Sequence, residues 1–235
     1  IIKMLNFPNG IILVTGATGT GKSTTLYSFL QKLNVEGVNL VTVEDPVEMD
    51  IKGVNQVQVN SDIGLDFATV LRSILRQDPN IIMIGEIRDS ETARIAVRAS
   101  ITGHLVVSTI HTNNSLNTIE RLLDMDVERY LLASALTGIV SQKLARRLCE
   151  KCRVKKPVTI TEKNLFKSVL GIDVNEVYEA NVSGCPYCNH GYRGRIAIQE
   201  VLLITQEIRD AISAGIRKDE LRKLVYNKDV ITMLQ

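Results

Sequence analysis

The residues best suited to chemistry lie near the start of the sequence, in a glycine-rich loop between an apolar run and a polar helix. The run Ile11–Thr15 is rich in β-branched residues and predicts a buried strand. Glycine tolerates backbone dihedrals that side chains forbid, so the N–H groups of such a loop can converge on an anion. From Gly16 to Ser23 the spacing Gly-x4-Gly-Lys-Ser is the P-loop pattern for phosphate binding. A glycine-rich turn without a ligand is the alternative.

Strand, loop, Lys-Ser pair and helix occur in the order that the P-loop requires, which favours a nucleoside triphosphate site. We expect Lys22 to contact the β- and γ-phosphates and the Ser23 hydroxyl to bind Mg²⁺. The following helix directs its positive N-terminal end at the same anion. The residues predicted to bind the nucleotide are Gly16, Ala17, Thr18, Gly19, Thr20, Gly21, Lys22, Ser23 and Thr24.

Two acidic side chains follow predicted strands. Glu44 comes after the strand at 40–43, and Glu86 ends the apolar run that begins at Ile81. Ligands of open α/β sheets bind at the carboxyl ends of the strands, so both carboxylates are candidates for catalysis. The run before Glu86 resembles a Walker B strand but has Gly85 where an aspartate commonly stands, which puts Mg²⁺ coordination there in doubt. A solvated acidic turn is the alternative for Glu44.

A further predicted strand, residues 103–112, has a histidine near each end. Seven residues separate His104 from His111, which places them on opposite faces of an ideal strand. We therefore expect them to occupy the two ends of the strand rather than to share a metal. His111, beside the P-loop, is predicted to sense phosphate, and a satisfied loop histidine is the alternative.

Four cysteines form two C-x2-C pairs, the spacing of a tetrahedral Zn²⁺ site made of four thiolates. The predicted ligands are Cys149, Cys152, Cys185 and Cys188. Such a closed site stabilises a fold rather than catalysing a reaction. Two free or redox-active pairs are the alternative, and four thiolates make His190 unnecessary as a ligand.

Periodicity predicts the remaining elements. Amphipathic helices are expected at residues 66–76, 90–102, 113–125, 130–147 and 207–227, a half-exposed hairpin strand at 54–59 and a further strand at 196–204.

Composition restricts the class of protein. Hydrophobic residues make up 45% and charged residues 23% of the 235 residues, as in soluble globular proteins. Because no apolar run approaches the roughly 20 residues of a membrane span, the cytoplasm is the expected compartment. Aromatic residues are sparse, at 4%, which disfavours base stacking with nucleic acid.

These motifs together resemble one family over nearly the whole chain: the motor ATPases of type II secretion and type IV pilus assembly, in the secretion-ATPase superfamily. The five signatures are residues 16–25, residues 44–48 (the Asp box), residues 82–89 (Walker B), residues 103–112 (the His box) and the four cysteines. Gly85 in Walker B is itself usual in this family. The cysteine set resembles the assembly and secretion branch rather than the retraction branch.

The resemblance implies an α/β, RecA-like P-loop domain that uses ATP, Mg²⁺ and Zn²⁺. The implied organisation is an ATPase core at 1–148, a tetracysteine zinc subdomain at 149–190 and a C-terminal strand and helical part at 191–235. The family's N-terminal domain, which supplies arginines to ATP, is expected to be missing. Two positions depart from the family: Asp126, where glycine is common and a helix-end turn favours it, and Lys143, where arginine is usual.

The resemblance also implies roles and partners. Lys22 holds phosphate, Glu86 polarises the lytic water with Glu44 as a second acid, and His111 reads the γ-phosphate; which glutamate is the main activator stays open. The expected assembly is a homo-hexamer at the cytoplasmic face of the inner membrane. It would associate peripherally through an inner-membrane platform protein and other assembly proteins, and bind no nucleic acid.

Three other functions compete with a motor. A RecA-like nucleic-acid translocase would need a basic, aromatic surface. An ATP-binding fragment would hydrolyse little ATP on its own. A metal-binding adaptor would leave the other four motifs unexplained.

Overall fold

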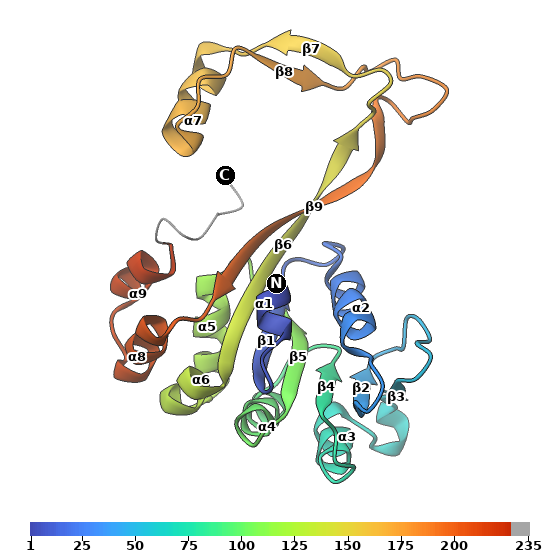
Figure 1. Cartoon of the computed structure of the whole chain (residues 1–235), viewed down its shortest axis with the longest axis vertical. Helices are drawn as coiled ribbons and strands as arrows, with labels where there is room; N and C mark the ends of the chain where they lie inside the picture. Colours follow the sequence, from blue (N-terminus) through green and yellow to red (C-terminus); the bar gives the residue numbers. More distant parts are fainter. Residues whose placement is uncertain (227–235) are drawn as a thin grey trace. The chain divides into compact units, whose positions relative to one another are not determined.

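The computed structural model describes residues 1–226, which fall into two compact units (Figure 1). Of the described residues, unit 1 comprises 1–142 and 199–226, and unit 2 comprises 143–198. The chain leaves unit 1 within strand β6 (Leu136–Leu148) and re-enters it within β9 (Tyr192–Leu203). The sequence placed these boundaries after residues 148 and 190 instead.

Unit 1 is built on a seven-stranded sheet with the order β3-β2-β4-β5-β1-β6-β9. The strands not yet bounded are β1 (Gly10–Thr15), β2 (Leu40–Glu44), β3 (Asn55–Gln58), β4 (Ile81–Ile84) and β5 (Leu105–Ile110). From β3 to β6 all neighbouring strands pair in parallel. The predicted α/β class is thereby confirmed. Because parallel strands point the same way, the P-loop and the residues that follow β4 and β5 lie at one edge of the sheet.

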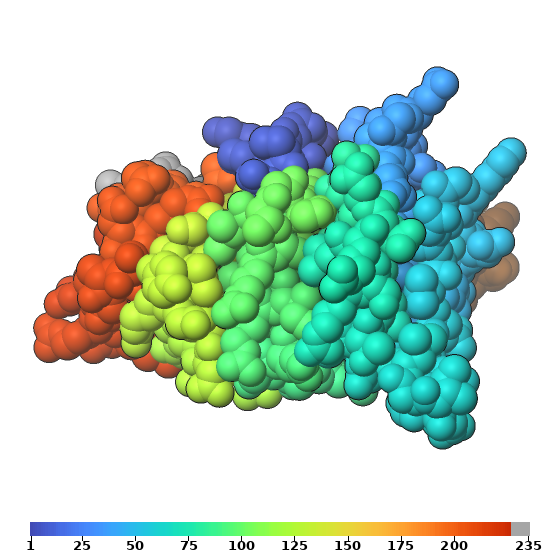
Figure 2. Space-filling model, turned by 90° about the horizontal axis from the view of Figure 1, so that it is seen from below, coloured from blue at the N-terminus to red at the C-terminus, as the bar shows by residue number. Residues whose placement is uncertain are grey.

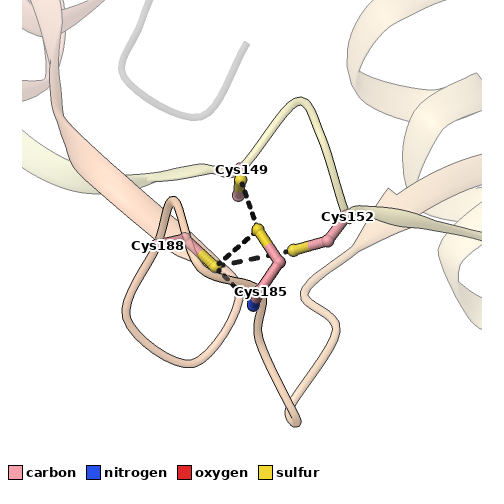
Figure 3. A group of neighbouring side chains, drawn as sticks. All are labelled: Cys149, Cys152, Cys185 and Cys188. Atoms are coloured by element: carbon pink, nitrogen blue, oxygen red, sulfur yellow. Dashed lines mark hydrogen bonds between the residues drawn. The ribbon is translucent and has the colours of Figure 1, made fainter.

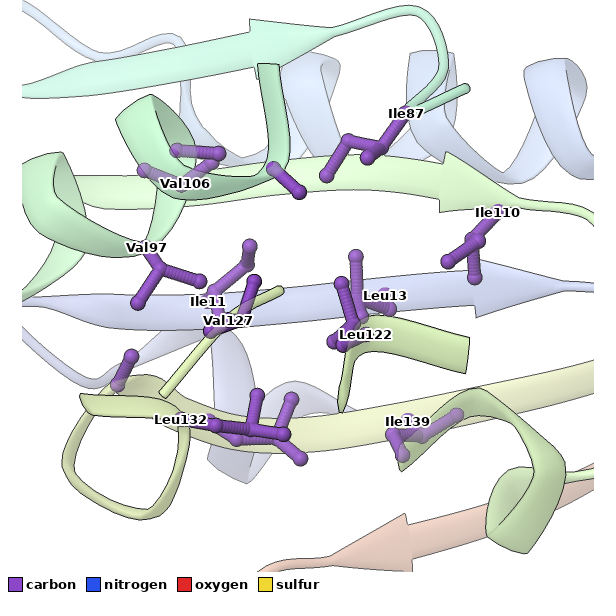
Figure 4. Close-up of a cluster of buried hydrophobic side chains, with 14 of the residues drawn as sticks. Ile11, Leu13, Ile87, Val97, Val106, Ile110, Leu122, Val127, Leu132 and Ile139 are labelled. Atoms are coloured by element: carbon purple, nitrogen blue, oxygen red, sulfur yellow. The ribbon is translucent and has the colours of Figure 1, made fainter. Parts of the chain in front are cut away.

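Alternate residues of β1 enter two different hydrophobic clusters, so both faces of the sheet are buried. Ile11 and Leu13 belong to one cluster, whereas Ile12 and Val14 belong to the other. Figure 4 shows Ile11 and Leu13 among side chains of β5, β6 and the covering helices. Each buried aliphatic side chain contributes about 1.5–3 kcal/mol. This arrangement gives the P-loop a rigid strand to begin from.

Helices cover both faces. Toward the cluster of Ile12 lie α1 (Ile2–Leu5) and α2 (Lys22–Leu33). Toward the cluster of Ile11 lie α3 (Phe67–Ile74), α4 (Ser90–Ile101), α5 (Ser115–Asp124), α6 (Arg129–Ala135), α8 (Gln206–Ala214) and α9 (Lys218–Val225). Figure 2 shows α6, α4 and α3 side by side, in yellow-green, green and teal.

Three predicted elements were wrong. The helix expected at 130–147 is α6 up to Ala135 and then β6, whose first seven residues are buried next to β1. The expected hairpin strand is β3, which pairs in parallel with β2. The C-terminal helix is two helices, α8 and α9, because Gly215 ends α8 in the left-handed conformation. Its predicted last residue, Asn227, lies outside the described residues.

Unit 2 contains an antiparallel pair, β7 (Val154–Pro157) with β8 (Glu176–Glu179), and helix α7 (Ile160–Leu170). A capping box between Thr159 and Glu162 begins α7. None of the residues 160–170 is buried, and Cys149 is the one buried hydrophobic side chain between residues 143 and 198. Unit 2 therefore has no hydrophobic core of its own.

Among residues 1–226, no helix is both long and apolar enough to cross a membrane.

Candidate functional site

The P-loop begins where β1 ends and runs into α2. Gly21 precedes α2 with a φ of 85°, a left-handed conformation that glycine adopts at low cost. Gly16 has a φ of 150°, and a Cβ there would lie 2.4 Å from the backbone oxygen of Gln142. Gly21 therefore requires glycine for its conformation, whereas Gly16 requires it both for its conformation and because a Cβ has no room.

Lys22 lies at the first position of α2 and is 9% exposed. Its ammonium Nζ donates to the backbone oxygens of Gly16, at 3.0 Å, and Ala17, at 3.1 Å. Burial lowers the pKa of Lys22, and the negative charge of Glu86 partly offsets this effect. The cation is thus held over the loop, where it can meet phosphate oxygens. Ser23 follows it half-buried, and Thr24 is exposed.

Glu86 lies two residues beyond β4. Its carboxylate pairs with Arg88 and, at 3.3 Å between Oε2 and Nε2, with His111 from the end of β5. The Glu86 side chain is 13% exposed. Gly85 allows this placement, because a Cβ there would lie 3.3 Å from the backbone oxygen of Val43 on β2. The predicted acid and the predicted histidine therefore meet at the edge that holds the P-loop.

Glu44 is in a different environment. It is 3% exposed, and its carboxylate accepts hydrogen bonds from Tyr27, from Thr42 at 2.5 Å and from Gln56 at 3.0 Å. The Tyr27 hydroxyl in turn accepts from the backbone N–H of Glu48 at 3.0 Å. Burial and the bond to Glu44 raise the pKa of Tyr27. Through these hydrogen bonds Glu44, at the end of β2, links its strand to α2 and β3.

The other histidine of the predicted strand lies elsewhere. The Nδ1 atom of His104 is 2.8 Å from the backbone oxygen of Ala99, near the C-terminal end of α4. The two histidines occupy opposite ends of the strand, as their spacing indicates. Among residues 1–226, neither histidine belongs to a cluster of side chains that could together bind a metal ion.

The four cysteines meet in unit 2, as Figure 3 shows. All four sulfur atoms lie within 4.8 Å of one another, and none of these cysteines is in a disulfide. The distances are 3.8 Å for Cys149–Cys185, 3.6 Å for Cys152–Cys188 and 3.6 Å for Cys185–Cys188. Four thiolates at about 2.3 Å from one Zn²⁺ are about 3.8 Å apart in a tetrahedron. The donor set therefore fits zinc.

Sequence reasoning missed several residues of the site. Arg88 pairs with Glu86, Tyr27 and Gln56 hold Glu44, and Gln142 contacts the P-loop. Arg88 lies two positions after Glu86, a proximity that could have indicated it. The other three reach the site across the fold, and their spacing carries no such signal.

The fold and the loop define an α/β protein with a P-loop at the carboxyl edge of a parallel sheet. Residues 1–235 match the family model described as type II/IV secretion system protein, and the chain belongs to this family. The predicted family is thereby confirmed.

Two relatives illustrate the match. The chain is 49% identical over 230 residues to the putative type II secretion system protein E of Escherichia coli (strain K12), which covers 95% of this chain and 45% of the relative. It is 47% identical over 233 residues to the type IV pilus assembly ATPase PilB of Thermus thermophilus, which covers 98% of this chain and 26% of the relative. The chain thus spans less than half the length of these curated relatives.

Solved structures agree. The pilus retraction motor PilT with bound ADP is 30% identical, with a TM-score of 0.69 over 98% of this chain and 61% of that one. The Legionella pneumophila ATPase DotB is 26% identical, with a TM-score of 0.68 over 99% of this chain and 56% of that one. The mixed α/β fold with its parallel sheet matches these RecA-like ATPases.

Proposed function

We propose that this chain hydrolyses ATP as the motor domain of a machine that assembles a pilus or pseudopilus, in type II secretion or type IV pilus biogenesis. The observation that carries the proposal is the placement of Glu86 beside the P-loop. Its carboxylate pairs with His111 and Arg88, and its negative charge partly offsets the lowering of the Lys22 pKa by burial. The relatives described as type II secretion protein E and pilus assembly ATPase support the same function.

Phosphoryl transfer depends on positioning and on neutralising charge more than on covalent help from the protein. The N–H groups of Gly19 to Lys22 and the Lys22 ammonium hold the phosphates, and Ser23 is the residue that would hold Mg²⁺. When bound, Mg²⁺ neutralises charge on the β- and γ-oxygens. His111 orients Glu86 and faces the γ-phosphate.

Of the two acids, Glu86 is the water activator. A base needs a carboxylate oxygen that a water molecule can reach. Glu44 is 3% exposed and already accepts three side-chain hydrogen bonds, which suits a positioning role.

The substitution Glu86→Gln tests this assignment. It keeps the size of the side chain but removes the base, so we expect kcat for ATP hydrolysis to fall by about 10²–10⁴-fold. ATP affinity, measured with a fluorescent nucleotide, should change little. Glu91→Gln is the matched control, because Glu91 is exposed on α4 and pairs with Arg72. Normal turnover by Glu86→Gln would refute the assignment.

An ATP-binding domain with little hydrolysis of its own is the second candidate. The observation that favours it is that this chain spans only part of its relatives: its match covers 45% of the length of one relative named above and 26% of the other. Tight ATP binding by the wild-type chain with negligible turnover would establish this alternative. A chain that neither binds nor hydrolyses ATP would refute both.

The proposed assembly is a homo-hexameric ring at the cytoplasmic face of the inner membrane. It reaches the membrane through a platform protein and other assembly proteins. As the family resemblance implies, arginines of the family's N-terminal domain would complete the ATP site.

Unit 2 is the proposed zinc-binding subdomain. The sulfur–sulfur distances of 3.6–3.8 Å support Cys149, Cys152, Cys185 and Cys188 as its ligands. With no open coordination position, zinc would stabilise the fold of the unit and take no part in hydrolysis.

A further inference from the structure

Gln142 is a buried polar residue of β6 that the proposed chemistry does not use, although it lies beside the P-loop. Ser141 of β6 is opposite Thr15, the last residue of β1, in their parallel pairing. Gln142 follows Ser141 on β6, and Gly16 follows Thr15 at the start of the P-loop. The backbones approach so closely there that Gly16 has no room for a Cβ. Gln142 is only 2% exposed. Its amide must therefore find partners within the protein.

The Gln142 amide has partners on both sides of the phosphate-binding residues. Nε2 donates to the backbone oxygen of Thr20, in the loop, at 2.7 Å. Oε1 accepts from the Thr25 hydroxyl, in the first turns of α2, at 2.8 Å. A carbonyl oxygen can only accept, so the contact with Thr20 fixes which way the amide is turned. One side chain thus joins the loop to the helix across Lys22 and Ser23.

The bond to Thr20 sets the direction of a peptide plane. In a trans peptide the C=O of one residue and the N–H of the next point in opposite directions. With the Thr20 carbonyl turned toward Gln142, the Gly21 N–H is turned away from β6. Gly21 has no side chain to restrict its rotation, so an external partner is needed to hold this orientation.

Gln199 braces the amide from the neighbouring strand. Its Nε2 donates to Oε1 of Gln142 at 2.7 Å, and β9 lies beside β6 in the sheet. Both lone pairs of that oxygen are then occupied, one by Thr25 and one by Gln199. The braced amide has little freedom to rotate away from the loop.

We propose that Gln142, braced by Gln199, is a positioning residue that holds the P-loop ready for the phosphates of a nucleoside triphosphate. This inference rests on the proposed nucleotide-binding function. Without Gln142 the loop must be ordered by the nucleotide itself, so part of the binding energy is lost. The loss affects ATP and ADP alike, because both present a β-phosphate to the loop.

The test is the affinity of Gln142→Met for Mg·ATP and Mg·ADP, measured by competition with a fluorescent nucleotide. Methionine keeps the length of the side chain but makes neither hydrogen bond. With two bonds to the loop region lost, we expect both dissociation constants to rise by about 10–100-fold. Gln199→Leu removes only the brace, so a smaller rise of about 2–5-fold is expected.

Hydrogen exchange separates this role from a general loss of stability. In the nucleotide-free protein, amides of residues 19–23 should exchange faster in Gln142→Met, whereas those of β4 and β5 should not. Gln206→Met is the matched control, since Gln206 makes a side-chain hydrogen bond to Asp210 on the exposed face of α8. It should leave nucleotide affinity unchanged.

Gln142→Glu keeps the test decisive if Gln142→Met fails to fold. Glutamate can still accept from Thr25 and Gln199 but cannot donate to Thr20, so weak nucleotide binding is again expected. Wild-type affinity in both folded variants would overturn the inference. A wild-type chain that binds no nucleotide would instead overturn the proposed function.

Discussion

Glu44 ends strand β2 and Glu86 lies two residues beyond the neighbouring parallel strand β4, yet their surroundings give them different chemistry. Val43 pairs with Ile84, so the two acids lie near the same edge. Glu44 accepts hydrogen bonds from Tyr27, Thr42 and Gln56, whereas Glu86 pairs with the charged or titratable side chains of Arg88 and His111. Both acids were recognisable from sequence because each follows an apolar run. Their separate roles were not, because the three donors to Glu44 come from three different elements.

Tyr226 gives a prediction for alkaline pH. Its hydroxyl lies 3.3 Å from the carboxylate of Glu200, which is itself buried and bonded to Ser115 at 2.7 Å. Burial, and then the charge of Glu200, raise the pKa of Tyr226 to about 12. The folded protein keeps this proton where the unfolded chain, with a pKa of about 10, has lost it. The resulting stabilisation is complete below pH 10 and declines as the pH rises toward 12.

The substitution Tyr226→Phe removes that proton, so the pH dependence of stability should flatten. We expect the free energy of unfolding, measured by urea titration at pH 9 to 11, to fall less steeply with pH in Tyr226→Phe than in the wild type. Tyr178→Phe serves as the control, because Tyr178 is 45% exposed. Equal slopes in Tyr226→Phe and wild type would contradict the prediction.

Among the elements, strand β6 shows where sequence patterns stop being informative. Its apolar residues at 136, 139, 140 and 144 have helical spacing, and a helix, α6, does precede it. Pairing with β1 decides the outcome, because residues 136–142 are buried on both faces and a strand of this kind shows no alternation. The strands β1, β2, β4 and β5 were predictable because they are short, apolar and bounded by turns.

The turn after α5 was also recognisable from sequence, through Asp126. The N–H of Asp126 bonds to Leu123, at 3.1 Å, and that of Val127 to Leu122, at 3.3 Å, which is the Schellman pattern. Asp126 has a φ of 57°, a conformation that favours glycine. Its negative charge also lies at the negative end of the helix dipole. Two unfavourable effects therefore meet at one exposed residue.

Asp126→Gly should raise the stability of the protein. Relief of the left-handed strain and removal of the charge together should increase the melting temperature by about 2–4 °C. Asp126→Ala separates the two effects, since alanine removes the charge but keeps a Cβ in the left-handed conformation, and it should gain less or lose stability. A melting temperature for Asp126→Gly at or below that of the wild type would show that the turn is not strained.

At the scale of the molecule, the two units are stabilised by different forces. Unit 1 has two hydrophobic clusters, one on each face of its sheet. Among residues 143–198 of unit 2, Cys149 is the one buried hydrophobic side chain, and α7 buries none. Ile160 and Val182 are 81% and 79% exposed there. A unit of this size without a core needs a metal or other cross-link to fold. The spacing of the cysteines predicted the ligands, but it could not reveal that the surrounding segment has no core.

Removal of zinc should therefore unfold unit 2 and spare unit 1. We expect about one zinc per chain in the purified protein, and structural zinc contributes on the order of 10 kcal/mol to such folds. After chelation, protease should cut between residues 149 and 191, while the amides of β1, β4 and β5 stay protected from hydrogen exchange. Cys188→Ser should behave like the chelated protein. Ser168→Ala, a change on α7 that leaves all four sulfur atoms in place, should behave like the wild type. Protection of unit 2 that survives metal removal would mean that contacts other than the four thiolates hold it together.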